Sequence, residues 1–135
     1  MSRANQRAMT VLVVDDEPDI LDELRGFLAR HGHTVMCVDG AVAAIHSLGK
    51  DGPFDVLLTD IRMPDGSGLE VLRACRDLQP QAARYVMSGH AGPDEIAQAR
   101  NGGALDYFPK PVALRSLMEV LASMAQTPRR QARRR

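Results

Sequence analysis

The chain has 135 residues, 44% of them hydrophobic and 25% charged, and its 17 Lys and Arg are balanced by 17 Asp and Glu. This composition is typical of one globular domain and excludes a low-complexity or strongly charged chain. No apolar run approaches the roughly 20 residues of a membrane span, residues 1–7 lack the apolar segment of a signal peptide, and the two distant cysteines form neither a zinc motif nor a disulfide framework. We therefore expect a single-domain cytoplasmic protein.

The first half of the chain predicts three strands separated by two helices. The β-branched run 10–14 reads as a buried strand that ends in Asp15-Asp16, and Pro18 opens a helix after it. A second strand is expected at 34–38, and Asp39 can cap the helix that follows. The third apolar run, 54–59, ends at Asp60 directly before a Pro- and Gly-containing turn.

The second half continues the same alternation. Ser67 and Glu70 form a capping box, which marks the start of a third helix. The apolar patterns then predict strands at 83–87 and 105–108, and helices at 67–78, 94–101 and 114–124. Because Ile96 is the only bulky apolar residue of the helix over 94–101, we expect that helix to be weakly held. Five strand–helix units predict an α/β fold, a doubly wound five-stranded parallel sheet with helices on both faces.

Polar residues stand at the carboxyl ends of four of the five predicted strands. They are Asp15-Asp16, Asp60, Ser88 and Lys110. Taken singly, each has an ordinary structural interpretation, because Asp often caps a helix or begins a turn, and Lys-Pro is common in surface loops. In a parallel sheet, however, all four ends lie on one edge, where ligands bind. Two carboxylates 4 Å apart repel by about 4 kcal/mol at an effective dielectric of 20, so the acids favour a hard divalent cation such as Mg²⁺.

Four motifs carry a resemblance to a known family. They are Asp15-Asp16-Glu17-Pro18, the stretch 60–66, Ser88-Gly89 and the stretch 107–111. In this order and at these spacings they resemble the receiver (REC) domain of bacterial two-component response regulators, over roughly residues 10–126. The resemblance implies a (βα)5 flavodoxin-like fold with strand order 2-1-3-4-5. It also implies a phosphorylation-activated signalling switch rather than a conventional enzyme, which catalyses its own phosphotransfer and slow autodephosphorylation.

The resemblance assigns roles to the acids and the lysine. Asp60 would accept a phosphoryl group from a histidine kinase or a phosphotransfer protein. Asp16 and Asp60 would bind Mg²⁺ directly together with the Arg62 carbonyl, and Asp15 would act largely through water. Lys110 would pair with the phosphoryl oxygens, and the peptide bond before Pro111 would be cis.

The resemblance also implies how phosphorylation is read out. Ser88 would donate a hydrogen bond to the phosphoryl group, and Tyr107 would turn inward as Ser88 moves. The face made by the fourth helix, the fifth strand and the fifth helix would then change and control a partner. That partner would be a downstream output protein, a removed output domain or a second copy in a phosphorylation-dependent homodimer. A plain structural alternative for Tyr107 is a half-buried strand aromatic with its hydroxyl in water.

Two other functions fit parts of the sequence. A Mg²⁺-dependent phosphatase or phosphotransferase could also use a strand-end Asp nucleophile, but no insertion is long enough to form a lid over Asp60. The Arg-rich tail 127–135 suggests nucleic-acid binding, yet no folded DNA-binding motif accompanies it, and a solvated linker is the preferred interpretation. We expect a disordered or frayed segment 1–9, a receiver domain 10–126 and a basic disordered tail 127–135.

Overall fold

The computed structural model describes residues 7–125, which alternate between strands and helices. The elements are β1 (Thr10–Val14), α1 (Pro18–Arg30), β2 (Thr34–Val38), α2 (Ala41–Lys50), β3 (Val56–Asp60), β4 (Arg62–Met63), β5 (Gly66–Ser67), α3 (Gly68–Leu78), β6 (Ala83–Ser88), α4 (Pro93–Asn101), β7 (Ala104–Pro109) and α5 (Leu114–Ala125). Every predicted strand and helix is therefore present, with bounds that differ by one or two residues.

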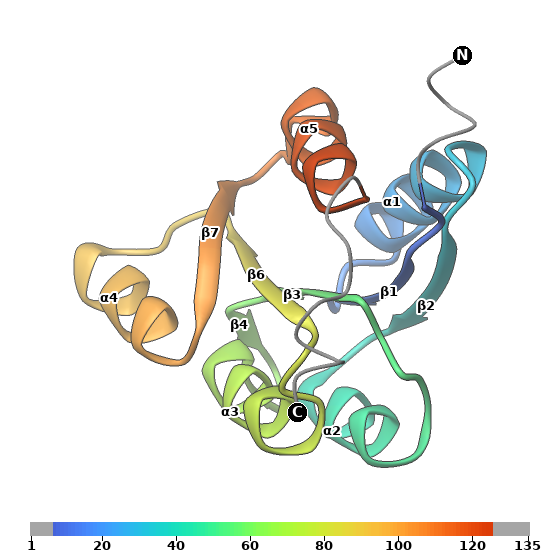
Figure 1. The fold of residues 1–135 in the computed structure, drawn as a ribbon. Coiled ribbons are helices and arrows are strands. Elements are labelled where there is room, and N and C mark those ends of the chain that lie inside the picture. The colour runs from blue at the N-terminus through green and yellow to red at the C-terminus, as the bar shows by residue number, and fades with distance from the viewer. Residues whose placement is uncertain (1–6, 126–135) are drawn as a thin grey trace.

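Five of the strands form one parallel sheet in the order β2-β1-β3-β6-β7 (Figure 1). Numbered among themselves, these strands have the order 2-1-3-4-5, so the predicted doubly wound fold is confirmed. The central strand β3 is buried along its whole length, as its uncharged sequence predicts. The sheet order reverses between β1 and β3, and a doubly wound sheet opens a crevice for ligands at such a point.

Alternate residues of the strands enter two separate apolar cores, one on each face of the sheet. Leu12 and Leu57 belong to the core shared with α2, α3 and α4, whereas Val11 and Leu58 belong to the core shared with α1 and α5. Figure 1 shows the two groups of helices on opposite sides of the sheet. Burial of both faces is what holds the central strand ends in fixed positions.

The prediction that Asp39 caps α2 is wrong. Gly40 is the N-cap residue of α2, and glycine has no side chain that could bond the helix amides. The carboxylate of Asp65, from the loop after β4, instead accepts hydrogen bonds from the amides of Ala41 (2.8 Å) and Val42 (3.1 Å). A Cβ at position 40 would lie 2.8 Å from both Asp65 carboxylate oxygens, so glycine is required for this approach. The cap thus comes from a residue far away in the sequence.

The ends of the chain differ in part from expectation. Met9 is buried, its amide donates to His33 Nδ1 (3.0 Å), and Arg7 forms an ion pair with Asp55 (3.4 Å). The expected fraying therefore does not extend to residues 7–9, because an apolar side chain and two polar contacts hold them. The predicted basic tail 127–135 lies outside the described residues. No helix in the described part of the chain is long and apolar enough to cross a membrane.

Candidate functional site

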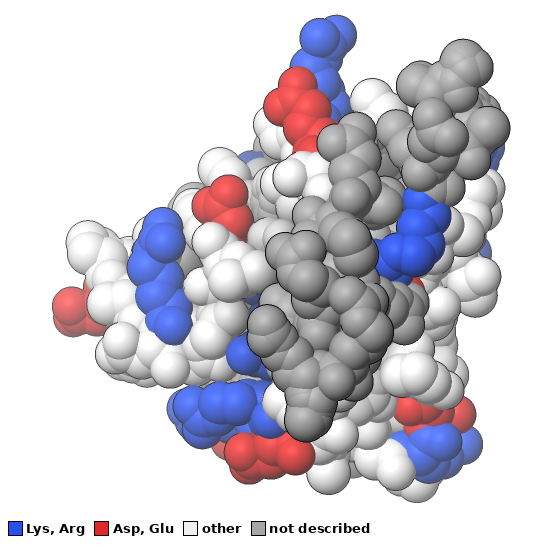
Figure 2. All heavy atoms as spheres, in the orientation of Figure 1, with Lys and Arg blue, Asp and Glu red and all other residues white. Residues whose placement is uncertain are grey.

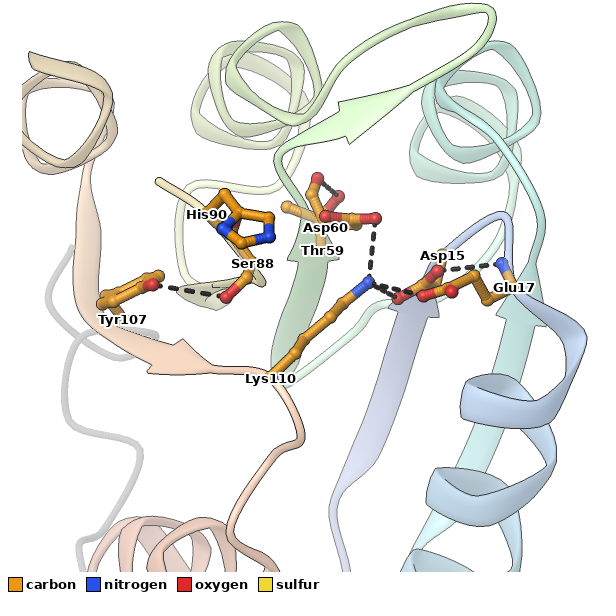
Figure 3. Close-up of polar contacts among 8 residues, drawn as sticks. All are labelled: Asp15, Glu17, Thr59, Asp60, Ser88, His90, Tyr107 and Lys110. Carbon is orange, nitrogen blue, oxygen red and sulfur yellow. Dashed lines mark hydrogen bonds and ion pairs between the residues drawn. The ribbon is translucent and has the colours of Figure 1, made fainter. Parts of the chain in front are cut away.

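Asp60 is the last residue of β3, the central strand, and its side chain points beyond the edge of the sheet (Figure 3). The backbone around it is fixed from two sides. The Ile61 amide donates to the Met87 carbonyl (3.3 Å), and the Gly68 amide donates to the Ile61 carbonyl (2.7 Å). A Cβ at position 68 would collide with the Asp60 carbonyl oxygen, so a glycine at the start of α3 permits this close packing. Asp60 is consequently held in place at the strand end.

The Lys110 side chain extends from the segment after β7 to the space between Asp60 and Asp15, as Figure 3 shows. Its ammonium lies 2.7 Å from Asp15 Oδ2, 3.1 Å from Asp60 Oδ2 and 3.1 Å from Glu17 Oε1. The Lys110-Pro111 bond is cis, as predicted. Two carboxylates from the β1–α1 connection and one from the end of β3 therefore surround one cation.

Burial and the neighbouring charges shift the pKa values of Lys110 and Asp15 in opposite directions. Burial lowers the pKa of the Lys110 ammonium, but its bonds to Asp15, Asp60 and Glu17 outweigh burial, so the pKa is raised well above the ordinary lysine value. Burial raises the pKa of Asp15, and the bonds from Lys110 and the Glu17 amide oppose that rise. Lys110 is therefore a permanent cation in this site.

Three acids form a cluster that fits a hard divalent cation. One carboxylate oxygen of each of Asp15, Asp16 and Asp60 lies within 4.8 Å of the others. Asp15 is fully buried, Asp60 nearly so, and Asp16 is exposed. An all-oxygen donor set with one side open to water suits Mg²⁺ or Ca²⁺ and does not suit Zn²⁺. The sequence prediction that these three residues meet is confirmed.

Ser88 and Tyr107 lie together on the far side of Asp60. The Ser88 hydroxyl accepts a hydrogen bond from the His90 amide (3.2 Å), while the Ser88 carbonyl accepts from the Tyr107 hydroxyl (3.2 Å) and from the Lys110 amide (2.9 Å). Tyr107 is half-buried, and its hydroxyl is bonded to protein, which differs from the plain alternative of a hydroxyl in water. Any movement of Ser88 must therefore disturb both Tyr107 and the chain at Lys110.

An open pocket lies over these groups. Its lining includes Asp16, Glu17, Asp60, Arg62, Ser88, His90 and Lys110. Asp15 lies beneath this surface, and Tyr107 lies behind Ser88, so neither is part of the lining. The Arg62 guanidinium also bonds both carboxylate oxygens of Glu95 in α4, at 3.0 and 2.7 Å. The role predicted for the Arg62 carbonyl stays a prediction.

Sequence reasoning missed three of the lining side chains. It assigned no role to Glu17, to His90 or to the side chain of Arg62. Glu17 directly follows the acid pair at the end of β1, and His90 lies two residues after Ser88, so adjacency to the strand ends was the available signal. The contacts of Glu17 with Lys110 and of Arg62 with Glu95 join residues of different elements, and periodicity carries no information about such pairs.

The fold and the site together define a class. This is a doubly wound α/β domain that presents a cluster of three acids, a lysine and a hydroxyl at the carboxyl edge of its sheet. Residues 11–122 match the family model of the response regulator receiver domain, and the chain belongs to that family.

Relatives and solved structures agree with this membership. The chain is 37% identical to the response regulator protein PilR of Pseudomonas aeruginosa over 83% of the chain and 25% of PilR. It resembles a CheY-like receiver domain protein of Methanospirillum hungatei, with a TM-score of 0.83, 28% identity and coverage of 88% of this chain and 94% of that one. A Burkholderia pseudomallei response regulator, solved with a phosphorylated aspartic acid, a calcium ion and citrate, matches with a TM-score of 0.78 and 30% identity over 87% of this chain and 71% of that one. The chain spans 18% to 47% of the length of eight curated relatives that it matches.

Proposed function

We propose that Asp60 is the residue on which this receiver domain is phosphorylated. A single observation carries the proposal: Asp60 is the carboxylate that lines the pocket, belongs to the acidic cluster and bonds Lys110, so cationic partners can approach it from two sides. The Asp60 carboxylate oxygen attacks the phosphorus of a phosphohistidine on a histidine kinase or a phosphotransfer protein. A P–O bond forms, the P–N bond breaks, and the imidazole nitrogen leaves with the electron pair.

The chain's own residues neutralise the charge of the transferred group. Lys110, already beside Asp60, pairs with phosphoryl oxygens, and Ser88 donates a hydrogen bond to another of them. Asp16, Asp60 and the Arg62 carbonyl would hold Mg²⁺, with Asp15 acting largely through water. When bound, Mg²⁺ supplies additional positive charge at the phosphoryl oxygens.

The output surface is the face formed by α4, β7 and α5. Ser88 shares its carbonyl with Tyr107 and Lys110, so a shift of Ser88 toward a phosphoryl group is felt in β7 and beside α4. A charge-assisted hydrogen bond from Ser88 is worth about 1.5–3 kcal/mol, enough to bias two loosely packed arrangements of α4. The partner is a downstream output protein, an output domain of a longer regulator, or a second copy in a homodimer.

Nucleic-acid binding is not the function we assign. Figure 2 shows basic and acidic side chains interspersed over the described part of one face rather than one continuous basic area. The Arg-rich segment 127–135 lies outside the described residues, and its predicted role as a solvated linker stays a prediction. The predicted cytoplasmic location likewise stays a prediction.

The proposal is tested by phosphorylation with a small donor. Incubation with acetyl phosphate and Mg²⁺ is expected to add one phosphoryl group to the protein, detected by intact-mass spectrometry. Asp60→Asn abolishes the addition, whereas Asp19→Asn, a matched loss of an exposed acid in the first turn of α1, leaves it intact. Equal labelling of the Asp60→Asn variant would assign the phosphoryl group elsewhere.

Two further variants separate the roles of the neighbours. Asp16→Asn lowers the affinity for Mg²⁺, measured by calorimetric titration, because it removes a ligating charge. Lys110→Ala leaves the Mg²⁺ affinity unchanged or higher, because it removes a competing positive charge beside the cluster. Unchanged Mg²⁺ binding in Asp16→Asn would exclude that residue as a ligand.

A further inference from the structure

Three carboxylates surround the ammonium of Lys110, those of Asp15, Asp60 and Glu17, at 2.7, 3.1 and 3.1 Å. The ammonium donates hydrogen bonds to Glu17 and Asp60, and its contact with Asp15 is an ion pair. A phosphoryl group on Asp60 needs a bond from this ammonium, so it competes with these carboxylates for Lys110.

Two of the three partners are poorly placed to leave. The Asp15 side chain is 0% exposed, and its other oxygen accepts the Glu17 amide at 2.9 Å. The Asp60 side chain is 8% exposed and carries the phosphoryl group itself. Release of either would take the Lys110 charge away from a buried carboxylate, which costs more than taking it away from an exposed one.

The Glu17 side chain is different, because it is 58% exposed. Once detached from Lys110, its carboxylate can be hydrated at little cost. Glu17 is therefore the partner that Lys110 can exchange for a phosphoryl oxygen.

The helix itself does not explain a glutamate at position 17. Glu17 is the N-cap residue of α1, where Ser, Thr, Asp and Asn are preferred, and its side chain makes no cap hydrogen bond. The carboxylate instead turns toward Lys110, 93 residues further along the chain (Figure 3). Among the described residues, Lys110 is the one hydrogen-bond and ion-pair partner of the Glu17 side chain.

We propose that Glu17 is a positioning residue that holds the Lys110 ammonium in the unphosphorylated site and is displaced when a phosphoryl group binds. The inference rests on the proposed phosphorylation of Asp60, and it adds that Glu17 competes with the phosphoryl group for Lys110. Glu17 thereby opposes the phosphorylated state, since each phosphoryl group must displace it. A glutamate that merely shaped the helix start would have no such effect.

The test is the affinity for beryllofluoride, a phosphoryl analogue, at saturating Mg²⁺ for each variant. Glu17→Gln keeps the size of the side chain and weakens its hold on Lys110, so it is expected to bind beryllofluoride about two- to fivefold more tightly, the range of an exposed ion pair. Glu17→Asp keeps the charge but withdraws the carboxylate by one methylene, so it is expected to tighten binding as well. Asp19→Asn, the matched control, is expected to bind as the wild type does.

The possible outcomes distinguish an effect of the Glu17–Lys110 contact from an effect of the charge at position 17, and both from a failure of the proposed function. The inference would be overturned if Glu17→Gln bound beryllofluoride more tightly while Glu17→Asp bound it as the wild type does. It would also be overturned if all of these proteins bound it equally. Either result would leave Asp60 as the acceptor. If neither the wild type nor Asp60→Asn bound beryllofluoride, the proposed function would be overturned instead. As a second readout, the Lys110 ammonium protons, observed by ¹⁵N-edited NMR, should exchange faster with water in Glu17→Gln. Unchanged exchange would show that Glu17 does not hold the ammonium.

Discussion

Helices α3 and α4 cover the same face of the sheet, yet they are held in different ways. In α3, the buried residues are Gly68, Val71, Leu72 and Cys75, and a complete capping box begins the helix. In α4, only Ala99 is buried, Ile96 is half-buried, and the N-cap Gly92 has no side chain to bond the first turn. The helix that follows Ser88 is thus the loosely held one, and the helix that follows Asp60 is the firm one.

The difference explains how one domain can keep its site fixed and still move its surface. The start of α3 packs on the backbone of Asp60, so this helix must not shift. The segment that leads to α4 begins at Ser88, which lines the pocket and whose hydroxyl accepts from the His90 amide. Elements that move on binding come from the less stable parts of a structure. We therefore expect α4 to respond and α3 to stay in place.

Core truncations give the largest expected contrast between the two helices. Leu72→Ala removes a fully buried side chain and is expected to lower the free energy of unfolding by 2–5 kcal/mol, roughly the range for buried leucines. Ile96→Ala is expected to cost about 1 kcal/mol, because its side chain is only half-buried. Urea unfolding measures both. Equal losses would mean that α4 is packed as firmly as α3.

Removing the capping box is expected to give a smaller effect. The Ser67 hydroxyl accepts from the Leu69 amide (3.0 Å), and Glu70 bonds back to the Ser67 amide (3.3 Å). Ser67→Ala is expected to lower the free energy of unfolding by about 1 kcal/mol and to speed amide exchange in the first turn of α3. If exchange in α3 already equals that in α4 before the substitution, the cap is not what separates the two helices.

The smallest expected effect concerns the Arg62–Glu95 ion pair, which joins the loop after Asp60 to α4. Arg62→Ala is expected to leave the urea midpoint nearly unchanged, because the pair is exposed, and to speed amide exchange in α4. Arg73→Ala, on the exposed face of α3, is the matched control and should leave α4 exchange unchanged.

The same ion pair should depend on pH in a defined direction. The bond from Arg62 lowers the pKa of Glu95 below its ordinary value of 4.5. A lowered folded-state pKa means that the contribution of Glu95 is present above about pH 4.5 and is lost as the pH falls through the lowered pKa. The wild type and Arg62→Ala should therefore differ in α4 at pH 6, and the difference should shrink as the pH falls further below 4.5, as measured by amide chemical shifts. A difference that does not shrink as the pH falls would assign the effect of Arg62 to something other than this pair.

The sequence predicted the fold and the residues at the strand ends because both follow from short-range pattern. Alternating strands and helices require a parallel sheet, and a parallel sheet brings Asp15, Asp16, Asp60, Ser88 and Lys110 to one edge. The weak hold on α4 was also predictable, since it follows from a shortage of large apolar residues, although the fully buried residue is Ala99 rather than Ile96.

The features that the sequence did not predict are contacts between residues far apart in the chain. Asp65 replaces Asp39 as the cap of α2 because the loop between β4 and β5 passes close to Gly40. The short pair β4 and β5 has two residues per strand and so leaves no periodic signal. Glu17 meets Lys110 only because β1 and β7 end on the same edge of the sheet. Such contacts appear only once the topology is known.

Hydrogen exchange with and without beryllofluoride and Mg²⁺ tests the central claim most directly. Mass spectrometry of the wild type is expected to show altered protection across residues 89–108, which include α4 and most of β7, with residues 71–78 of α3 unchanged. Asp60→Asn is expected to show neither change. Altered protection confined to residues 60–66, with 89–108 unchanged, would contradict the account that phosphorylation of Asp60 is read out through α4.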